Sequence, residues 1–219
     1  NCEGENITVA VRFRVNDDLR YLSHAETIIV FKRACVRGGI EVQYSQGFNP
    51  RPKLSLPLPR SVGIESDDEL LELRVAASGF DTERFKTSLL SQLPEGIQLF
   101  EVDVLKSKEK FGAKAATYVF NLQRYGHNRK LTDRIKHLLE SENLEVERHV
   151  DSKGAARTID VRSFLKSIEF DEKIAFLTVE CKISSTGAIR IEEILKLLEL
   201  EREDLAGPVR RTKVQWKNN

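Results

Sequence analysis

Alternating apolar and polar positions open the chain and predict its first strand. Residues 7–15 place Ile7, Val9, Val11, Phe13 and Val15 on one side, and the intervening positions include Arg12 and Arg14. A period of two is typical of a strand that buries one face. We therefore expect Arg12 and Arg14 on the side of the sheet that helices do not cover.

A helical pattern follows, with the residues of a capping box in its first turn. Ser23 and Glu26 stand three positions apart, as a serine cap and its glutamate partner do. The apolar stripe consists of Ala25, Ile28, Phe31 and Cys35. Gly38 and Gly39 then favour the end of the helix.

The rest of the first half continues the same rhythm. We predict strands over 40–44, 54–58, 71–75 and 98–104, and a second helix that begins after Asp81. An order of strand, helix, strands, helix and strand is that of the ferredoxin-like fold, a split β-α-β on a four-stranded sheet.

The second half repeats this order. Strands are predicted over 118–123, 145–149, 158–170, 175–183 and 209–216, with helices around Leu131 and Ile191. The chain is therefore expected to be α+β, with two ferredoxin-like halves in tandem. We place the halves at 1–105 and 117–219, joined by a polar, lysine-rich linker over 106–116.

Composition narrows the classes of protein to which the chain can belong. It has 219 residues, with 35 basic and 34 acidic side chains, so it is not a polybasic tail, although a local basic patch can exist. No apolar run approaches the roughly 18 residues of a membrane helix. The polar opening over 1–6 is unlike a signal peptide, and we expect a cytoplasmic protein that does not contact a membrane.

Cysteine and histidine spacing predicts no metal site and no cofactor. The cysteines are Cys2, Cys35 and Cys181, and they match no metal or redox motif. We expect Cys35 and Cys181 to be buried apolar residues.

A stiff, basic stretch provides the strongest candidate for a binding site. The sequence YSQGFNPRPKLSLPLP over 44–59 contains four of the chain's six prolines, two cations and no acid. Gly47 and the Asn-Pro step favour a turn, and prolines order a loop before any ligand arrives. Such a loop suits an anion such as phosphate or carboxylate. The residues that we assign to this site are Gln46, Phe48, Asn49, Arg51 and Lys53.

Two interpretations of these residues stay open. Phe48 can stack on a base or fill the core, and the stretch can instead be a stiffened hairpin with solvated charges. Arg12 and Arg14 can form a cationic floor for RNA, converging with the stiff loop into one positively charged pocket, or can pair with Glu72 or another cross-strand acid.

Arg20 and His24 form a second candidate group at the start of the first predicted helix. A helix N-terminus favours the neutral imidazole and attracts anions. His24 could therefore act as a general base, with Arg20 reaching the same region. His24 can equally be a structural residue beside the cap.

Two uninterrupted motifs resemble a known bacterial family. The segments LRYLSH over 19–24 and YSQGFNPRPK over 44–53 are similar to those of the DUF2344, or radical SAM-linked, proteins. The likeness is clearest from residue 9 to about residue 104. It implies a partner, because members are often fused to, or encoded beside, a radical SAM enzyme. The phrase around 47–55 also resembles the strand entry of Cas6-type RNA endonucleases, which use paired ferredoxin-like domains.

The resemblance and the residues together favour a binding role. The chain lacks a C-x-x-x-C-x-x-C run, so we expect a separate radical SAM enzyme to perform any radical chemistry. We predict a non-catalytic module that presents RNA, or another anionic substrate, to that enzyme. The alternatives are a metal-free, Cas6-like endoribonuclease that uses His24, and a protein-interaction scaffold.

Overall fold

The computed structural model describes residues 6–105, 110–123, 129–149 and 156–218. These residues contain four α-helices and extended β-structure, so the predicted α+β class is confirmed. The chain divides into two compact units. Unit 1 comprises the residues up to Ala113 and those from Trp216 onwards, and unit 2 comprises Lys114–Gln215.

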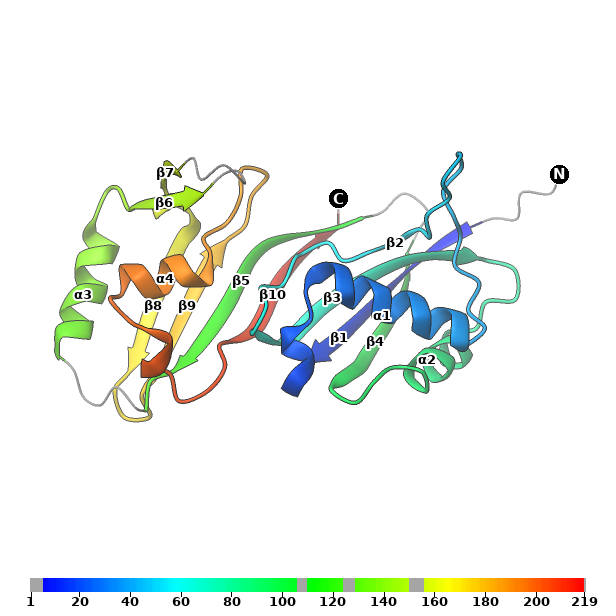
Figure 1. Cartoon of the computed structure of the whole chain (residues 1–219), viewed down its shortest axis with the longest axis horizontal. Coiled ribbons are helices and arrows are strands. Elements are labelled where there is room, and N and C mark those ends of the chain that lie inside the picture. The colour runs from blue at the N-terminus through cyan, green and yellow to red at the C-terminus, as the bar shows by residue number, and fades with distance from the viewer. Residues whose placement is uncertain (1–5, 106–109, 124–128, 150–155, 219) are drawn as a thin grey trace. The chain divides into compact units, whose positions relative to one another are not determined.

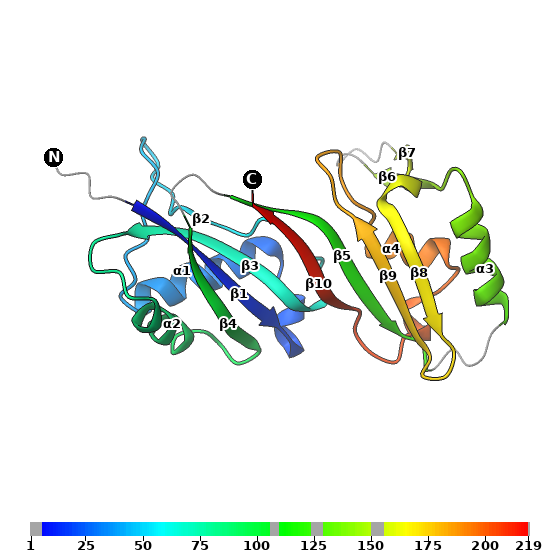
Figure 2. The ribbon, with the colours of Figure 1, turned by 180° about the vertical axis from the view of Figure 1, so that it is seen from behind.

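Unit 1 is an antiparallel sheet with helices on one face. Its elements are β1 (Asn6–Val15), η1 (Asp17–Tyr21), α1 (His24–Arg37), β2 (Leu54–Ser55), β3 (Glu65–Ala76), α2 (Thr82–Leu90) and β4 (Ile97–Leu105). The strands follow the order β4-β1-β3, and β2 pairs with β3. Figure 1 shows α1 in front of this sheet, and Figure 2 shows the strands from behind.

The alternation of β1 separates the two faces of this sheet as predicted. Val9, Val11, Phe13 and Val15 are buried in the core beneath the helices. The Phe13 and Phe31 rings meet edge to face, with centroids 4.7 Å apart. The capping box of α1 is confirmed as well: Ser23 N donates to Glu26 Oε2 at 2.8 Å, and Glu26 N donates to Ser23 Oγ at 3.3 Å.

The strand predicted over 40–44 is wrong, because that segment forms only isolated bridges. Strand lengths in unit 1 differ from the prediction at two further places. The strand expected over 54–58 has only two residues, because Pro57 and Pro59 have no N–H to donate to a neighbouring strand. In contrast, β3 begins at Glu65, six residues before the predicted start. Its first half brings Glu65, Asp68 and Glu69 into buried positions.

A buried arginine fixes the segment that precedes α1. The guanidinium of Arg60 donates to the backbone oxygens of Leu19, Arg20, Leu22 and Ile64, at 2.7–3.2 Å. The residue is only 7 % exposed. These bonds hold η1 against the start of β3.

Unit 2 also combines a sheet with helices. Its elements are β5 (Phe111–Asn121), α3 (Arg129–Glu140), β6 (Glu145–His149), β7 (Ala156–Asp160), η2 (Arg162–Phe164), β8 (Leu165–Asp171), β9 (Phe176–Lys182), α4 (Ile191–Leu197), η3 (Arg202–Asp204) and β10 (Arg210–Asn218). The strand order is β10-β5-β9-β8, and β6 and β7 form a separate hairpin. The first residues of β5 lie within the stretch predicted as a linker, and η2 interrupts the strand predicted over 158–170.

A buried ion pair connects the small hairpin of unit 2 to α4. Arg148 Nε donates to Glu193 Oε1 at 2.6 Å, and Arg148 Nη2 donates to Glu193 Oε2 at 2.8 Å. The two side chains are 13 % and 9 % exposed. Burial tends to raise the pKa of Glu193, but hydrogen bonds from Arg148 and the Arg190 backbone hold it below its ordinary value of 4.5.

Two of the cysteines lie in apolar surroundings, as expected. Cys35 and Cys181 are buried. Burial raises the pKa of the Cys35 thiol to about 11 and that of Cys181 to about 12. Among the described residues, no helix is long and apolar enough to cross a membrane.

We expect Arg60→Ala to lower the free energy of unfolding by about 3 kcal/mol or more, because four carbonyl oxygens lose a charged donor. Urea denaturation measures this loss. Arg33→Ala, at an exposed position of α1, is the matched control and should change stability by about 0.5 kcal/mol at most. Equal stabilities of the two variants would contradict the role of Arg60.

We expect Glu193→Gln to destabilise the protein by about 3–5 kcal/mol near neutral pH, because Arg148 loses its buried counter-charge. The folded-state pKa of Glu193 is depressed, so its contribution is present above pH 4.5 and lost as the pH falls through the lower folded value. The stability gap between wild type and variant, measured by urea unfolding, should therefore narrow in acid.

The neighbouring Glu192→Gln is the control for this experiment. Glu192 pairs with Arg202 at 2.7 Å, but both side chains are more than half exposed. Its loss should cost about 1 kcal/mol or less. A Glu193→Gln gap that stayed constant between neutral and acidic pH would show that the ion pair is not the cause.

Candidate nucleic-acid interface

Residues 44–53 form a hairpin that is anchored at the end of β3. Gln43 N donates to Arg74 O at 2.8 Å, and Arg74 N donates to Lys53 O at 3.0 Å. Isolated bridges join Val42 to Val75 and Tyr44 to Pro52. In Figure 1 this loop projects from the unit between α1 and β2. We refer to it as the 44–53 hairpin.

The turn of the 44–53 hairpin follows from its glycine and prolines. Ser45 N donates to Arg51 O at 2.8 Å, and Arg51 N donates to Ser45 Oγ at 2.9 Å. Gly47 has a φ of +129°, which side-chain-bearing residues rarely adopt. Pro50 and Pro52 fix φ on the returning arm. These bonds and fixed φ angles therefore restrict the conformations of the tip.

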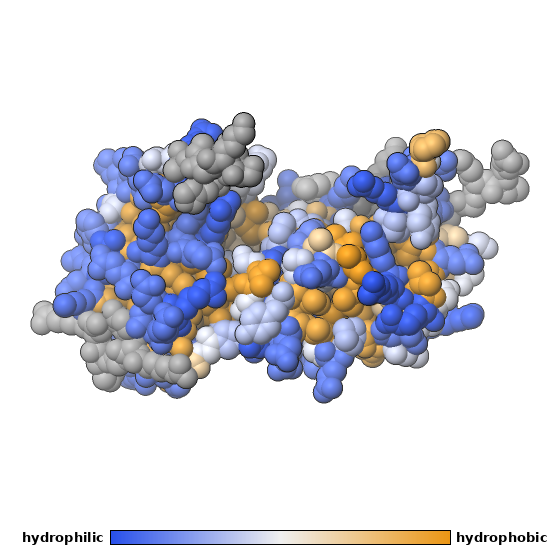
Figure 3. Space-filling model, in the orientation of Figure 1, coloured by the Kyte–Doolittle hydropathy of each residue, from blue (hydrophilic) through white to orange (hydrophobic). Residues whose placement is uncertain are grey.

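An aromatic ring at the tip of the hairpin is fully exposed to solvent. Phe48 is 101 % exposed, and Gln46, Asn49 and Arg51 are also exposed. Figure 3 shows a hydrophobic group at the end of this projection, next to hydrophilic surface. Of the two predicted roles of Phe48, filling the core is thus wrong. Exposed rings beside cations and amides suit stacking on an unpaired base.

A polar hollow of about 380 Å³ lies at the base of the hairpin. Three cations line it, namely Lys53, Arg74 and Lys110, together with the single carboxylate of Glu72. That carboxylate accepts a hydrogen bond from Phe111 N at 2.5 Å. Cations therefore outnumber acids in this hollow, and its chemistry suits a phosphate or carboxylate group.

Arg12 lies on the uncovered sheet face as predicted, but carboxylates surround it. Its Nη2 donates to Asp68 Oδ1 at 2.5 Å, and its Nη1 lies 3.7 Å from Glu101 Oε2. Glu72, which the sequence suggested as a cross-strand partner of Arg12, instead accepts a hydrogen bond from Phe111 N. Arg12 is therefore neutralised within the fold by acids on both neighbouring strands.

Arg14 is exposed on the same face. The guanidinium groups of Arg12 and Arg14 lie 5.7 and 5.8 Å from the centre of the Phe100 ring. Phe100 is 41 % exposed. The face thus presents one paired and one exposed arginine around an aromatic ring, with Glu101 beside them, and is not a purely cationic floor.

Arg20 and His24 lie near the start of β3. Arg20 donates to Asp17 O and to the Tyr21 hydroxyl, and its Nη1 lies 3.9 Å from Glu65 Oε1. His24 is the first residue of α1, and its buried Nδ1 has no hydrogen-bond partner among the described residues.

The predicted site residues are thus spread along β3. Arg20 contacts Glu65 at the beginning of β3, whereas the hairpin bonds to Arg74 near its end. Nine residues of extended strand span about 30 Å. The structure does not bring Arg12, Arg14, Arg20 and His24 together with the 44–53 hairpin in one pocket.

The acidic run over 65–69 was missed by the sequence reasoning. Asp68 accepts from Arg12 and, at 3.0 Å, from Trp216 Nε1. The Trp216 ring packs against Ala10, Leu70 and Leu105. The run 65–69 lies directly before the strand predicted over 71–75 and contains four acids. Acids that enter a strand beside the core need arginines or N–H donors as partners, and this is the clue that the run offered.

Comparison with known proteins identifies a family. A family model described as "Uncharacterized protein conserved in bacteria (DUF2344)" matches residues 8–193. No curated protein matches the chain.

Proposed function

The chain belongs to the DUF2344 family of bacterial proteins, and we propose that it is a non-catalytic module that binds RNA and presents it to a partner radical SAM enzyme. In this proposal the 44–53 hairpin makes the principal contact. We propose the radical SAM partner because the motifs 19–24 and 44–53 resemble those of radical SAM-linked proteins. We propose RNA as the ligand because of the chemistry of the hairpin.

The proposal includes a fold of two ferredoxin-like halves. In unit 1 the chain order β1-α1-β2-β3-α2-β4 accompanies the sheet order β4-β1-β3-β2. In unit 2, with the hairpin of β6 and β7 set aside, the chain order is β5-α3-β8-β9-α4-β10 and the sheet order is β10-β5-β9-β8. These two orders support the proposal, because they are the orders expected of a split β-α-β arrangement.

The single observation that carries the RNA proposal is the bare ring of Phe48 on a pre-ordered basic tip. A protein that only needed a stiff turn gains nothing from an aromatic side chain that is 101 % exposed. Stacking on a base would remove the ring from water, and the hollow beside Lys53 and Lys110 can take a phosphate farther along the same strand.

The geometry favours this role over RNA cleavage by His24. General-base catalysis needs a charge-stabilising partner within reach of the same phosphate. Lys53 lies at the end of β3, far from His24, and the Arg20 guanidinium is already engaged by Asp17 and Tyr21. Neither Arg20 nor Lys53 therefore offers a cation that is both unengaged and close to His24, and this supports the binding role.

We expect the protein to bind tRNA or single-stranded RNA, with an affinity that falls between about 50 and about 200 mM salt. Phe48→Ala should weaken binding about tenfold, because a stacked base contributes about 1–3 kcal/mol. Arg51→Glu should weaken binding and also lower its salt dependence. Filter binding at two salt concentrations measures both effects.

Two exposed positions away from the hairpin provide controls. Arg33→Glu on α1 makes the same charge change as Arg51→Glu, and Leu90→Ala on α2 removes an apolar side chain that is 45 % exposed. Neither should alter binding. If RNA did not bind, or bound equally to Arg51→Glu, the proposal would fail. Co-purification of a radical SAM subunit without RNA would then favour the scaffold alternative.

A further inference from the structure

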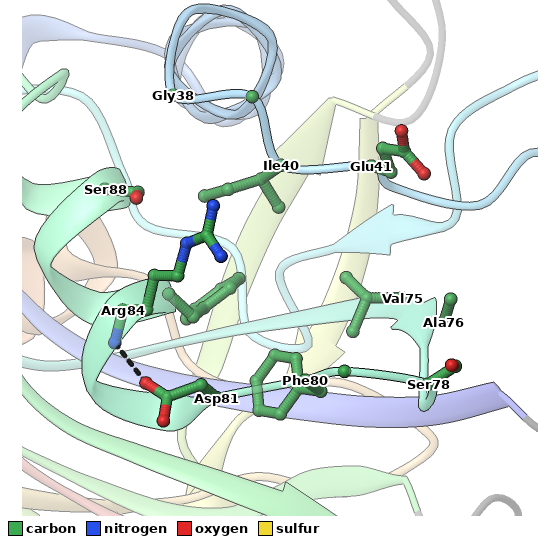
Figure 4. A pocket seen from close by; sticks show the side chains of 13 residues that line it. Gly38, Ile40, Glu41, Val75, Ala76, Ser78, Phe80, Asp81, Arg84 and Ser88 are labelled. Carbon is green, nitrogen blue, oxygen red and sulfur yellow. Dashed lines mark hydrogen bonds between the residues drawn. The ribbon is translucent and has the colours of Figure 1, made fainter.

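A second hollow, of about 240 Å³, lies on the helical side of unit 1, and none of the predicted site residues lines it. The end of α1, the end of β3 and the first turns of α2 surround it, as Figure 4 shows. Its apolar lining consists of Ile40, Val75, Ala76, Phe80 and Phe85. One cation, Arg84, stands in its wall.

Arg84 differs from Arg60 and Arg148, whose guanidinium groups stabilise the fold. Its backbone N–H donates to Asp81 Oδ1 at 2.6 Å, which makes Asp81 the cap of α2. Its guanidinium has neither an ion pair nor a hydrogen bond within the part of the chain that the structure describes. In Figure 4 it extends from α2 toward Ile40, along the wall of the hollow.

The two lining carboxylates leave this guanidinium available. Asp81 is occupied by the backbone of α2, and its carboxylate lies near the foot of the helix in Figure 4. Glu41 is exposed on the far rim, and its carboxylate is directed away from the hollow. An anion that entered the hollow would therefore meet Arg84 before either acid.

The walls of the hollow are fixed before any ligand binds. α1 and α2 approach so closely that a Cβ on Gly38 would lie 2.9 Å from Ser88 O. Gly39 and Gly79 turn the chain at φ of +65° and +69°. The Phe80 and Phe85 rings also pack together, with centroids 5.5 Å apart. A preformed site loses little conformational entropy on binding.

We propose that this hollow binds a small organic carboxylate with an apolar body. The carboxylate would accept two N–H bonds from the Arg84 guanidinium, as planar fork geometry favours. The apolar body would rest on Ile40 and Phe80, the large apolar lining residues that stay partly exposed. The volume of about 240 Å³ lies below the roughly 300–1,000 Å³ of sites for drug-sized ligands, which suits a short branched or aromatic acid.

The test uses phenylacetate and 3-methylbutanoate as probes, at about 10 mM, because fragments of this size bind with millimolar dissociation constants. Titration of ¹⁵N-labelled protein should shift the amide signals of Gly38, Gly39 and Gly79. Phenylacetamide, which lacks the charge, should bind about tenfold more weakly. Arg84→Gln should weaken phenylacetate binding about tenfold or more.

Arg33→Gln is the matched control and should leave phenylacetate binding unchanged, because Arg33 is an exposed residue of α1 that does not line the hollow. Three results would overturn the proposal: no shift with either acid, equal affinities of wild type and Arg84→Gln, or equal affinities for phenylacetate and phenylacetamide. Binding of inorganic phosphate in preference to both acids would also contradict it. None of these results depends on RNA binding by the 44–53 hairpin.

Discussion

Burial of carboxylates at the start of β3 determines which cations of unit 1 can meet a ligand. Asp68 is 6 % exposed and accepts from Arg12 and Trp216, and Glu65 accepts from Asp17 N and lies within 3.9 Å of Arg20. Acids removed from water must be paired, because an unpaired buried charge is strongly destabilising. Of the two arginines predicted to form an RNA-binding floor, Arg12 therefore stabilises the fold, whereas Arg14 is exposed.

The C-terminal end of β3 meets a basic and exposed hairpin, unlike its acidic and buried start. There the backbone of Arg74 holds a hairpin whose side chains over 46–51 face solvent and form no ion pair with any residue that the structure describes. Lys53 and Lys110 meet only one carboxylate in the hollow below. One strand thus has a neutralised, structural end and a basic, exposed end, and this polarity is why we place ligand binding at the 44–53 hairpin.

Sequence patterns correctly predicted the helices and strands that depend on residues close to one another in the chain. The alternation over 7–15, the capping box at Ser23 and the Asp81 cap each depend on neighbours a few residues away, and β1, α1 and α2 begin within a residue of the expected positions. The first half of β3 was missed because a run of acids becomes a strand only when distant Arg12 and Trp216 meet it. The turn of the hairpin was predictable from Gly47 and its prolines. The distance between the hairpin and Arg20 depends on the length and register of β3. No pattern of neighbouring residues predicts these two properties.

The most direct test of this polarity is an amide chemical-shift map of the ¹⁵N-labelled protein during titration with a short single-stranded RNA. The account predicts that the largest changes fall within 44–53 and at Lys110, while Arg12, Arg20 and His24 remain unperturbed. Chemical-shift changes at Arg12, Arg20 and His24, without changes in the 44–53 hairpin, would contradict the account. They would place the ligand at the acidic end of β3.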